Sequence, residues 1–532
     1  MNWIPAQLPF GQTGYFSRLI NDYVREAEEL RPFYAHPVSP EGIDAAITAR
    51  EQFPVNRKVL VDVLEQQYQN LPAAMPVWEN IQSLRQENTF TVVTAHQPAI
   101  FTGTLYFIYK IVHSIRLAEK LNADHPGKHF VPVFYMGSED ADLDELGHIY
   151  MGTEKISWDT RQKGAVGRMK PKGLEKILDR IRGELSVLPH GEELLASLRE
   201  AYLESPDIQT ATLRLIHRLF SEYGLVVLIP DHADLKKLMM PVFEEDLFLH
   251  TPSNIVGQTI AAFPAQYKVQ ANPREINLFY LKDDIRNRID RDGDHFIVHD
   301  TSIRFDEAGI RKELQEHPER FSPNVILRGL FQETILPNIA FIGGGGETAY
   351  WLELKGLFAH YKTPFPLLIL RNSFLLINER WTGKLKHAEL SLEEIFRPEE
   401  DLVNELVRKE SGQQLTLEKE LADADHYYGR LKSLAQAVDP TLSQHVEALH
   451  ARAIQPLQEL EKKLFRAEKR KYGNQHRQIH ALKSALFPLG NLQERIENFM
   501  PWYAQRGRQF IKDIYDHSPA LPAAFIVLTE QV

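Results

Sequence analysis

Four consecutive glycines at residues 343–346 separate an apolar run from a predicted helix, and Glu347 follows them directly. A glycine run costs backbone entropy, so it indicates a tight turn or the close approach of a ligand to the backbone. It is not a Walker motif, because no Gly-Lys-Ser/Thr follows, and it is not Gly-x-Gly-x-x-Gly. A sharp turn without a ligand is the alternative, but the position at the end of a predicted strand favours a ligand site.

A second candidate loop, residues 95–103, joins an apolar run to another predicted helix. The amides of the first turn of such a helix form a natural anion site. His96 and Gln97 stand at the start of this loop, and Thr102 and Gly103 stand at the predicted start of the helix. The alternative is that His96 only ties the loop together.

A third loop contains three carboxylates within four positions: Glu139, Asp140 and Asp142 come after Ser138 at the end of a predicted strand. Clustered carboxylates hold Mg²⁺ or bind an amine or sugar hydroxyls. A helix cap within a solvated turn is the commoner explanation of an acidic run. The position at a strand end favours the functional interpretation.

Asn324, Arg328 and Gln332 recur every four residues, which places them on one face if this segment is helical. A guanidinium at this point can clamp a carboxylate or a phosphate. The alternative for Arg328 is an ion pair that supports the core. The histidines show no metal-binding spacing, so no metal site is predicted from the sequence.

Short apolar strands that alternate with helices must position these loops. This alternation predicts an α/β fold with a parallel sheet, whose ligands bind beyond the carboxyl ends of the strands. Asp231 is expected to cap a helix, and residues 276–305 are expected to form an inserted β-hairpin. The predicted strands are residues 90–94, 130–136, 225–229, 339–342 and 366–370, with 524–528 as an edge strand.

The chain is expected to divide into four parts. Residues 1–85 form a helical segment, 86–384 the core, 385–490 a coiled-coil arm, and 491–532 a segment that returns to the core. Within the core, residues 150–215 are expected to be helical and 255–320 rich in β-structure. A near-heptad seam in the arm predicts a homodimer, because it needs a partner to bury it; its members are Val446, Leu449, Ala453, Leu457, Leu460, Leu464 and Ala467.

Composition excludes several classes. The 532 residues carry 72 acidic and 61 basic side chains, a net charge of −11, which disfavours a nucleic-acid partner. No apolar run approaches the roughly 20 residues of a membrane span, and no signal peptide is evident, so a cytoplasmic protein is expected. The chain has no cysteine, which excludes disulfides, thiolate zinc sites and a cysteine nucleophile.

Four stretches, in this order and with a helical segment before the last, resemble the BshC family, the cysteine ligases of bacillithiol biosynthesis. They are TAHQPAIFTGTLYFIYKI, PVFYMGSEDADLDELGH, FSPNVILRGLFQETILPNIAFIGGGGETAYWLELK and LQERIENFMPWYAQRG. The resemblance implies a Rossmann-like core with inserted connecting segments and a coiled-coil arm for dimerisation. It also implies that cysteine is added to glucosaminyl-malate, with bound ATP or ADP and possible use of Mg²⁺.

The family pattern is not matched everywhere. His96 replaces a usual glycine before Gln97, and Ala141 stands where the family commonly has a histidine. The four glycines replace Gly-Gly-Pro-Gly or Gly-Gly-Pro-Ala. The expected catalytic residues are His96, Glu139, Asp140, Asp142 and Arg328, and the expected substrate- or nucleotide-binding residues are Gln97, Thr102, Gly103, Ser138, Asn324, Gln332, Gly343, Gly344, Gly345, Gly346 and Glu347.

Two other classes of function remain open on the sequence. One is a different nucleotide-binding transferase of the Rossmann type. The other is a non-catalytic assembly factor, in which the coiled coil makes the functional contacts and the sheet is a scaffold.

Overall fold

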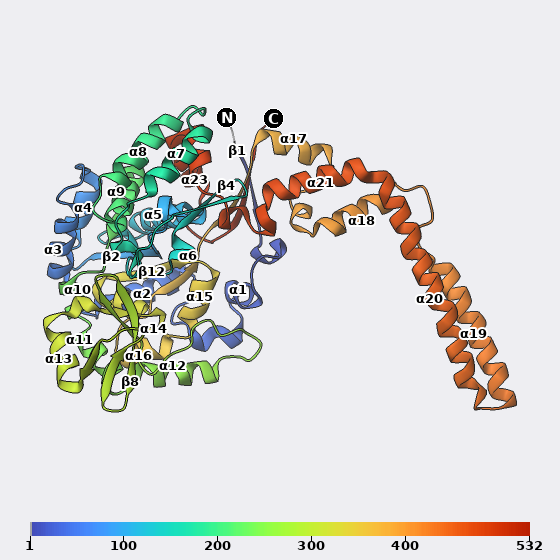
Figure 1. The fold of residues 1–532 in the computed structure, drawn as a ribbon, viewed down its shortest axis with the longest axis horizontal. Helices are drawn as coiled ribbons and strands as arrows, with labels where there is room; N and C mark the ends of the chain where they lie inside the picture. Colours follow the sequence, from blue (N-terminus) through green and yellow to red (C-terminus); the bar gives the residue numbers. More distant parts are fainter. Residues whose placement is uncertain (1–2, 532) are drawn as a thin grey trace. The chain divides into compact units, whose positions relative to one another are not determined.

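The computed structural model describes residues 3–531, which form two compact units (Figure 1). The first unit contains residues 3–11, 15–376 and 491–529. The second contains residues 12–14, 377–490 and 530–531. Both the predicted parallel sheet and the predicted helical arm are present, so the predicted fold class is confirmed.

A five-stranded parallel sheet is the centre of the first unit. Its spatial order is β13-β12-β2-β3-β6. The chain runs outward from β2 through β3 to β6, and then returns to the other side of β2 for β12 and β13. The strand order therefore reverses between β2 and β12, which is where doubly wound sheets bind ligands. The strands are β2 (Thr89–His96), β3 (His129–Met136), β6 (Val226–Leu228), β12 (Asn338–Gly343) and β13 (Leu367–Leu370).

The strands are almost entirely buried, as expected for parallel strands covered by helices. Residues of β2, β3, β12 and β13 share one core cluster with residues of α2 (Pro40–Glu51) and α5 (Tyr106–Asp124). After the four glycines the predicted single helix is divided into α15 (Gly345–Leu352) and α16 (Lys355–His360). The two parts are joined by the buried residues Glu353 and Leu354.

The predicted β-insertion is confirmed and is larger than one hairpin. It is an antiparallel sheet of order β10-β9-β8-β7-β11, and residues 292–295 turn between β8 and β9. Its strands are β7 (Leu278–Lys282), β8 (Ile285–Asp292), β9 (His295–Val298), β10 (Arg304–Asp306) and β11 (Phe321–Pro323). Helices α11 (Met240–Phe248) and α12 (Thr251–Ala262) precede this sheet, and α13 (Glu307–Glu316) lies between β10 and β11.

The expectation that residues 150–215 are helical is wrong for the first part of this segment. This part is an antiparallel hairpin of β4 and β5. Alternate residues of β4 are buried, whereas β5 is largely exposed. Three helices then lie side by side (Figure 1). These elements are β4 (His148–Met151), β5 (Glu154–Ser157), α7 (Leu174–Leu185), α8 (Gly191–Leu203) and α9 (Ile208–Phe220).

Both ends of the described chain meet in a third sheet, of order β1-β15-β14. The predicted edge strand near the C-terminus is therefore its middle strand, and it is buried along its whole length. The strands are β1 (Trp3–Leu8), β14 (Ser373–Ile377) and β15 (Phe525–Glu530). The other helices of this unit are α1 (Arg18–Val24), α3 (Arg57–Tyr68), α4 (Met75–Ser83), α22 (Met500–Arg506) and α23 (Arg508–His517).

The second unit is the helical arm. Its two longest helices, α19 (Glu418–Val438) and α20 (Leu442–Lys469), run side by side in an antiparallel pair (Figure 1). No helix within residues 3–531 combines the length and the apolarity that crossing a membrane requires. The other helices are α17 (Glu379–His387), α18 (Glu399–Glu410) and α21 (Gly473–Leu486).

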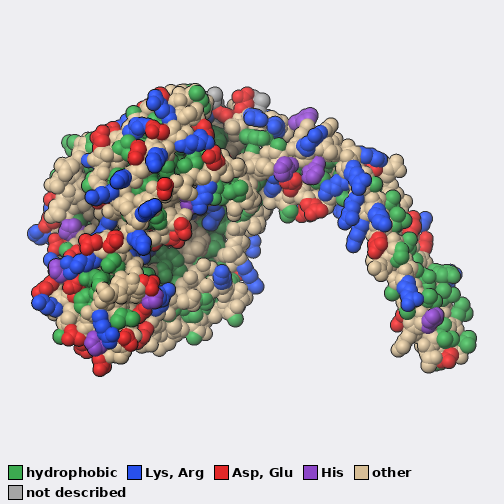
Figure 2. All heavy atoms as spheres, viewed as in Figure 1, with side chains coloured by type: hydrophobic (Ala, Val, Ile, Leu, Met, Phe, Trp, Pro, Cys, Tyr) green, Lys and Arg blue, Asp and Glu red, His purple; other side chains and the backbone are tan. Residues whose placement is uncertain are grey.

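The predicted seam is only partly covered by the helices of the arm within the described chain. Val446, Ala453 and Leu457 are partly buried, whereas Leu449, Leu460 and Leu464 are 40%, 45% and 37% exposed. Figure 2 shows hydrophobic side chains gathered over α19 toward its turn into α20, where Leu434 is 67% and Val438 83% exposed. The arm therefore presents more apolar surface than its own two helices cover.

His113 of α5 is held as a neutral imidazole inside the first unit. Its Nδ1 accepts a hydrogen bond from the backbone N–H of Asn372 at 3.1 Å, so its Nε2 carries the proton and donates to the Ala520 carbonyl at 3.0 Å. Burial is the main cause that lowers the pKa of His113 to about 4. A second proton would break the bond from Asn372.

This histidine predicts a loss of stability in acid. The unfolded chain binds a proton as pH falls below the ordinary pKa of about 6.5, whereas the folded chain does not until about 4, so unfolding is favoured across that window. Glutamine can make both hydrogen bonds without titrating. We expect wild type, compared with His113→Gln, to lose about 2 kcal/mol of unfolding free energy in urea between pH 7.5 and pH 5. Parallel pH curves for the two proteins would contradict this.

Candidate functional site

A cavity of about 470 Å³ lies at the carboxyl ends of the parallel strands, where the strand order reverses. Its walls come from the loops after β2 and β3, from the glycine turn after β12, and from α14 (Val325–Ile335). The following predicted site residues line it: His96, Gln97, Ser138, Glu139, Asp140, Asn324, Arg328, Gly344, Gly345, Gly346 and Glu347. Residues from all three predicted loops thus reach one cavity.

Thr102 and Gly103 do not line the cavity, which corrects the expected anion site at the start of α5. Thr102 is fully buried, and Asn498 donates a hydrogen bond to the Gly103 carbonyl. Helix α5 begins only at Tyr106, and the preceding amide, that of Leu105, already donates to the Glu497 carbonyl at 2.8 Å. The amides at this helix start are therefore not directed at a ligand.

Three further predicted residues lie outside the cavity. Asp142 caps α6 (Leu143–Leu146) by accepting a hydrogen bond from the Glu145 amide at 3.0 Å. It therefore has the helix-capping role that was the alternative explanation of the acidic run. Gln332 is fully buried and donates to Glu333 at 2.9 Å. Gly343 is the last residue of β12 and pairs with Leu370.

The glycine turn has an ordinary backbone. None of the four glycines has a positive φ, and Gly344 is extended at φ −76° and ψ 174°. A side chain at Gly345 would meet Ile20 Cγ1 at 3.2 Å, whereas one at Gly346 would meet no atom within 4 Å. Gly346 is therefore the position at which the absence of a side chain leaves room in the cavity.

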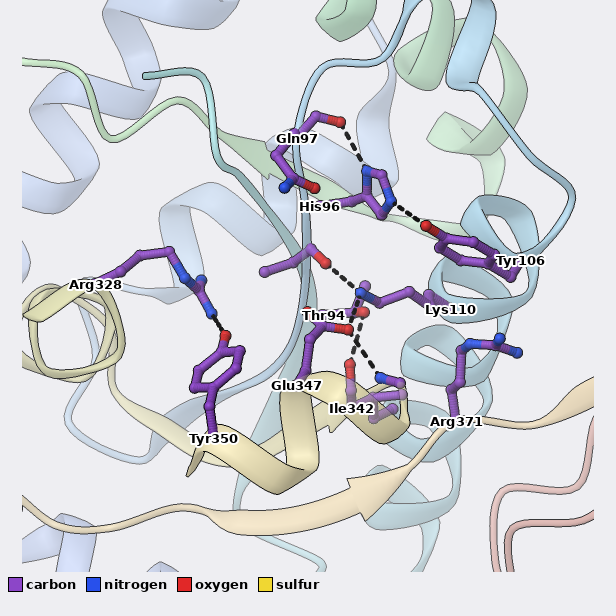
Figure 3. A network of polar contacts seen from close by, with 12 residues as sticks. Thr94, His96, Gln97, Tyr106, Lys110, Arg328, Ile342, Glu347, Tyr350 and Arg371 are labelled. Carbon is purple, nitrogen blue, oxygen red and sulfur yellow. Dashed lines mark hydrogen bonds and ion pairs between the residues drawn. The ribbon is translucent and has the colours of Figure 1, made fainter. Parts of the chain in front are cut away.

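His96 is not a free base. Its Nδ1 lies 2.9 Å from the Gln97 carbonyl, which can only accept, so Nδ1 carries the proton and Nε2 accepts from the Tyr106 hydroxyl at 2.9 Å (Figure 3). Burial, reinforced by Lys110, lowers the pKa of His96 to about 4. His96 thus orients Tyr106, which also lines the cavity.

A buried ion pair joins two of the loops. The Lys110 ammonium, on a side chain 2% exposed, lies 2.6 Å from Glu347 Oε2 and also donates to the Ala95 carbonyl at the end of β2 (Figure 3). The same Glu347 oxygen accepts from the Gly344 amide at 2.8 Å. Burial acts to raise the pKa of Glu347, but Lys110 and the Gly344 amide outweigh it and hold the pKa below its ordinary value.

Arg328 is a cation of the cavity without a carboxylate partner, and the exposed Arg495 is another within residues 3–531. The Arg328 guanidinium donates to the Tyr350 hydroxyl (Figure 3) and lies 3.4 Å from Gln332 Oε1. It makes no ion pair with any carboxylate within residues 3–531. A half-buried guanidinium with neutral partners retains attraction for an anion.

The acidic loop is held by a lysine that the sequence did not reveal. Lys236, on α10 (Ala233–Lys237), is fully buried and donates to Glu139 Oε1. Burial is the largest effect on Glu139 and raises its pKa despite Lys236. The expectation that Asp231 caps a helix is wrong. His232 does so, while Asp231 accepts two hydrogen bonds from Arg168 at 2.6 and 2.7 Å.

Several residues that line or support the cavity were not predicted from the sequence. Lys110 interrupts the apolar stretch IYKIV, and a buried lysine requires a partner, so its position was a usable signal. Arg371 directly follows β13, and applying the strand-end rule to that strand would have found it. Arg286 comes from the inserted sheet, and the sequence carries no signal that it reaches the cavity.

Metal ligands do not gather in the described chain. Within residues 3–531, no group of three or more histidine, aspartate or glutamate side chains is placed to hold a metal ion.

Comparison with known proteins identifies the family. "Bacillithiol biosynthesis BshC, N-terminal Rossmann-like domain" matches residues 5–372, and "Bacillithiol biosynthesis BshC, C-terminal coiled-coil domain" matches residues 374–530. The chain belongs to the BshC family. Its relatives include the "Putative cysteine ligase BshC" of Flavobacterium johnsoniae, 38% identical over 98% of this chain and 99% of the relative.

Other BshC relatives agree. The protein of the same name from Cytophaga hutchinsonii is 38% identical over 94% of both chains, and that of Flavobacterium psychrophilum is 37% identical over 98% of both. Among solved structures, a putative arginyl-tRNA synthetase from Campylobacter jejuni aligns at 9% identity with 84% of this chain and 98% of its own, but the TM-score of 0.23 is too low to support any argument.

In this BshC-family chain, Glu347→Gln is expected to leave the Lys110 ammonium buried without a counter-charge. We expect a loss of roughly 3 kcal/mol in unfolding free energy, the lower end for a broken buried pair because Glu347 is 26% exposed. A merely favourable helix-start charge would cost only about 0.3–1 kcal/mol. Urea denaturation measures the difference, and Lys110→Met in the same chain should recover most of the loss. A loss in the smaller range would show that the pair does not hold the loops.

Gly346→Leu is expected to obstruct the cavity without unfolding the protein, because a side chain there starts in open space. Binding of a ligand in the cavity should weaken by about tenfold or more, equivalent to about 1.4 kcal/mol, while the melting temperature stays close to wild type. Gly257→Leu is the matched control, since Gly257 is an exposed helical glycine with no atom within 4 Å of an added Cβ. Equal effects of the two substitutions would rule out a role for Gly346 in the cavity.

Proposed function

We propose that this chain is a ligase that adds cysteine to glucosaminyl-malate in the last step of bacillithiol synthesis, driven by ATP. The reaction joins the cysteine carboxylate to the amine of glucosaminyl-malate as an amide. The family assignment and the names of the relatives support the reaction class. The substrates and the nucleotide are parts of the proposal.

The observation that carries this proposal is the opposite polarity of two groups in one cavity. Arg328 is a cation without a carboxylate partner. Glu139 is a carboxylate that lines the cavity, and only its Oε1 accepts a hydrogen bond within the described chain. A ligase that joins a carboxylate to an amine needs both. In the proposal, Arg328 binds the carboxylate or its phosphorylated form, and Glu139 accepts a hydrogen bond from the amine.

ATP supplies the activation when bound, by converting the carboxylate into an acyl phosphate or acyl adenylate. The groups that fit an anionic ligand are Arg328 and the first amides of α15 at the glycine turn. Mg²⁺ is proposed to enter with the nucleotide, because three carboxylates of the cavity already have partners: Glu139 binds Lys236, Glu347 binds Lys110, and Asp140 accepts from Gln97 at 3.0 Å.

The remaining cavity residues have proposed supporting roles. Gln97 and Ser138 bind substrate hydroxyl or amide groups. Ser138 is suited to this because its hydroxyl is buried and has no hydrogen-bond partner within the described chain. Asn324 caps α14 through its side-chain oxygen, which accepts from the Ile326 amide at 2.8 Å, and so fixes the helix that carries Arg328.

Incubation of the purified chain with cysteine, glucosaminyl-malate, ATP and Mg²⁺ tests the function. We expect the amide product by mass spectrometry, together with ADP or AMP. Product without nucleotide would contradict the ATP dependence. No product with these substrates would contradict the ligase and leave the two alternatives, another Rossmann-type transferase or a non-catalytic assembly factor.

Arg328→Met is expected to lower kcat/KM by about tenfold or more, since a hydrogen bond to a charged group is worth about 1.5–3 kcal/mol. Arg328→Lys should recover only part of this loss, because an ammonium lacks the planar fork of the guanidinium. Arg291→Met, an exposed arginine on β8, is the control for loss of one positive charge. The proposed role of Arg328 is wrong if both methionine variants behave alike.

We also propose that two copies of this BshC-family chain associate through the arm. Helix α19 has no buried residue, and Leu434, Val438 and Leu449 are all at least 40% exposed. Apolar residues at this density on a helix pair are typical of a coiled-coil interface.

Multi-angle light scattering is expected to give twice the mass of one 61.3 kDa chain. Leu434→Glu with Val438→Glu should give the mass of one chain, because charges on the proposed interface cannot be buried without partners. Met75→Glu, at an exposed apolar residue of the first unit, is the control. A single-chain mass for wild type at micromolar concentration would exclude the dimer.

A further inference from the structure

Behind the acidic loop lies a largely buried cluster of four charges, of which the function proposed above uses only Glu139. It consists of two cations, Lys236 and Arg168, and two anions, Glu139 and Asp231. The Lys236 side chain is fully buried, and those of Asp231 and Glu139 are 2% and 10% exposed. Only Glu139 of these four residues lines the cavity.

The hydrogen bonds of Lys236 are fully committed. Its ammonium donates to Glu139 Oε1, to the Glu319 carbonyl at 2.9 Å and to Asp231 Oδ1 at 3.4 Å. An ammonium has three N–H donors, so none remains for a ligand. Lys236 is therefore neither a free nucleophile nor a substrate-binding group.

Among these contacts, the Lys236 ammonium lies closest to Glu139. Asp231 receives two short hydrogen bonds from Arg168 and lies 3.4 Å from the Lys236 ammonium, which makes its shorter contact with Glu139. Glu139 Oε2 has no hydrogen-bond partner within residues 3–531, while Oε1 is fixed by Lys236. One carboxylate oxygen is thus anchored and the other is presented to the cavity.

We propose that Lys236 is a positioning residue that keeps Glu139 ionised and turned toward the cavity, so that Glu139 removes a proton from the substrate ammonium. This inference rests on the proposed function. In the step, one N–H bond of the ammonium breaks, its electron pair stays on nitrogen, and the proton forms an O–H bond with Glu139. The neutral amine then attacks the activated carboxyl carbon, the phosphate or nucleotide leaves with the C–O electrons, and the second N–H proton passes to the departing phosphate oxygen as the amide forms.

The other charges near Glu139 set the direction of each substitution. Arg286 of the inserted sheet and Lys236 favour its ionised form, whereas Asp231 and Asp140 oppose it. Without Lys236, Glu139 would lie in a buried site beside Asp231 and should protonate more readily. Without the charge of Asp231, Lys236 and Arg168 would act on Glu139 unopposed and it should protonate less readily.

Infrared titration of the full-length protein, without substrates, tests this. The probe is the protonated-carboxyl band that disappears in Glu139→Gln. We expect its midpoint to rise by about one to three pH units in Lys236→Met and to fall in Asp231→Asn, because charge partners at this range shift a carboxyl pKa by that much. Lys236→Arg, which retains the charge, should stay near wild type. Should Lys236→Met fail to fold, the downward shift in Asp231→Asn still decides the matter.

Turnover adds a second readout. The acidic limb of the pH profile of kcat/KM for glucosaminyl-malate should move in the same directions as the infrared midpoint. Unchanged midpoints, or a uniform loss of activity with unmoved limbs, would overturn the role of Lys236 and leave a purely structural cluster. Shifted midpoints in a protein that makes no product would instead support the charge arrangement and overturn the proposed function, so the two failures are distinct.

Discussion

The ion pair between Lys110 and Glu347 is the constraint on which the cavity depends. It connects the end of β2, the first turns of α5 and the glycine turn after β12, which are the elements on the two sides of the point where the strand order reverses. Lys110 is too deeply buried to be solvated, so its charge requires Glu347 and the Ala95 carbonyl. Pairing of β12 with β2 sets how far apart the two strand ends lie, and the ion pair fixes the glycine turn against α5 beside the cavity.

Arg328 and Glu139 differ in how their charges are balanced. Lys236 neutralises Glu139 from behind, while Arg328 has only neutral partners. Because the supporting charges lie away from the cavity, its two sides keep opposite preferences for a ligand, one for an anion and one for an amine. The inserted antiparallel sheet adds Arg286, which lies 3.9 Å from Asp140 and contacts Phe279. The insertion is thus part of the wall of the cavity.

The sequence predicted the sheet well, because each parallel strand is a continuous apolar run and each candidate loop directly follows one. It predicted the site less well at helix starts. Thr102 and Asp142 were selected by position, but the first is fully buried and the second caps a short helix. The burial of Thr102 depends on tertiary structure, whereas the Asp142 cap is a local contact with the amide three residues along the chain. Lys236 was invisible for the same reason as the burial of Thr102, since a lysine in the polar-looking stretch HADLKK carries no mark of burial.

The central claim is that one cavity holds the anionic group of one substrate on Arg328 and the amine of the other on Glu139. A crystal structure of the protein with glucosaminyl-malate and a non-hydrolysable ATP analogue tests it most directly. The account predicts the amine nitrogen within hydrogen-bonding distance of Glu139 Oε2, and a carboxylate or phosphate oxygen on the Arg328 guanidinium. A complex with the amine directed away from Glu139, or with both ligands outside the cavity, would contradict it.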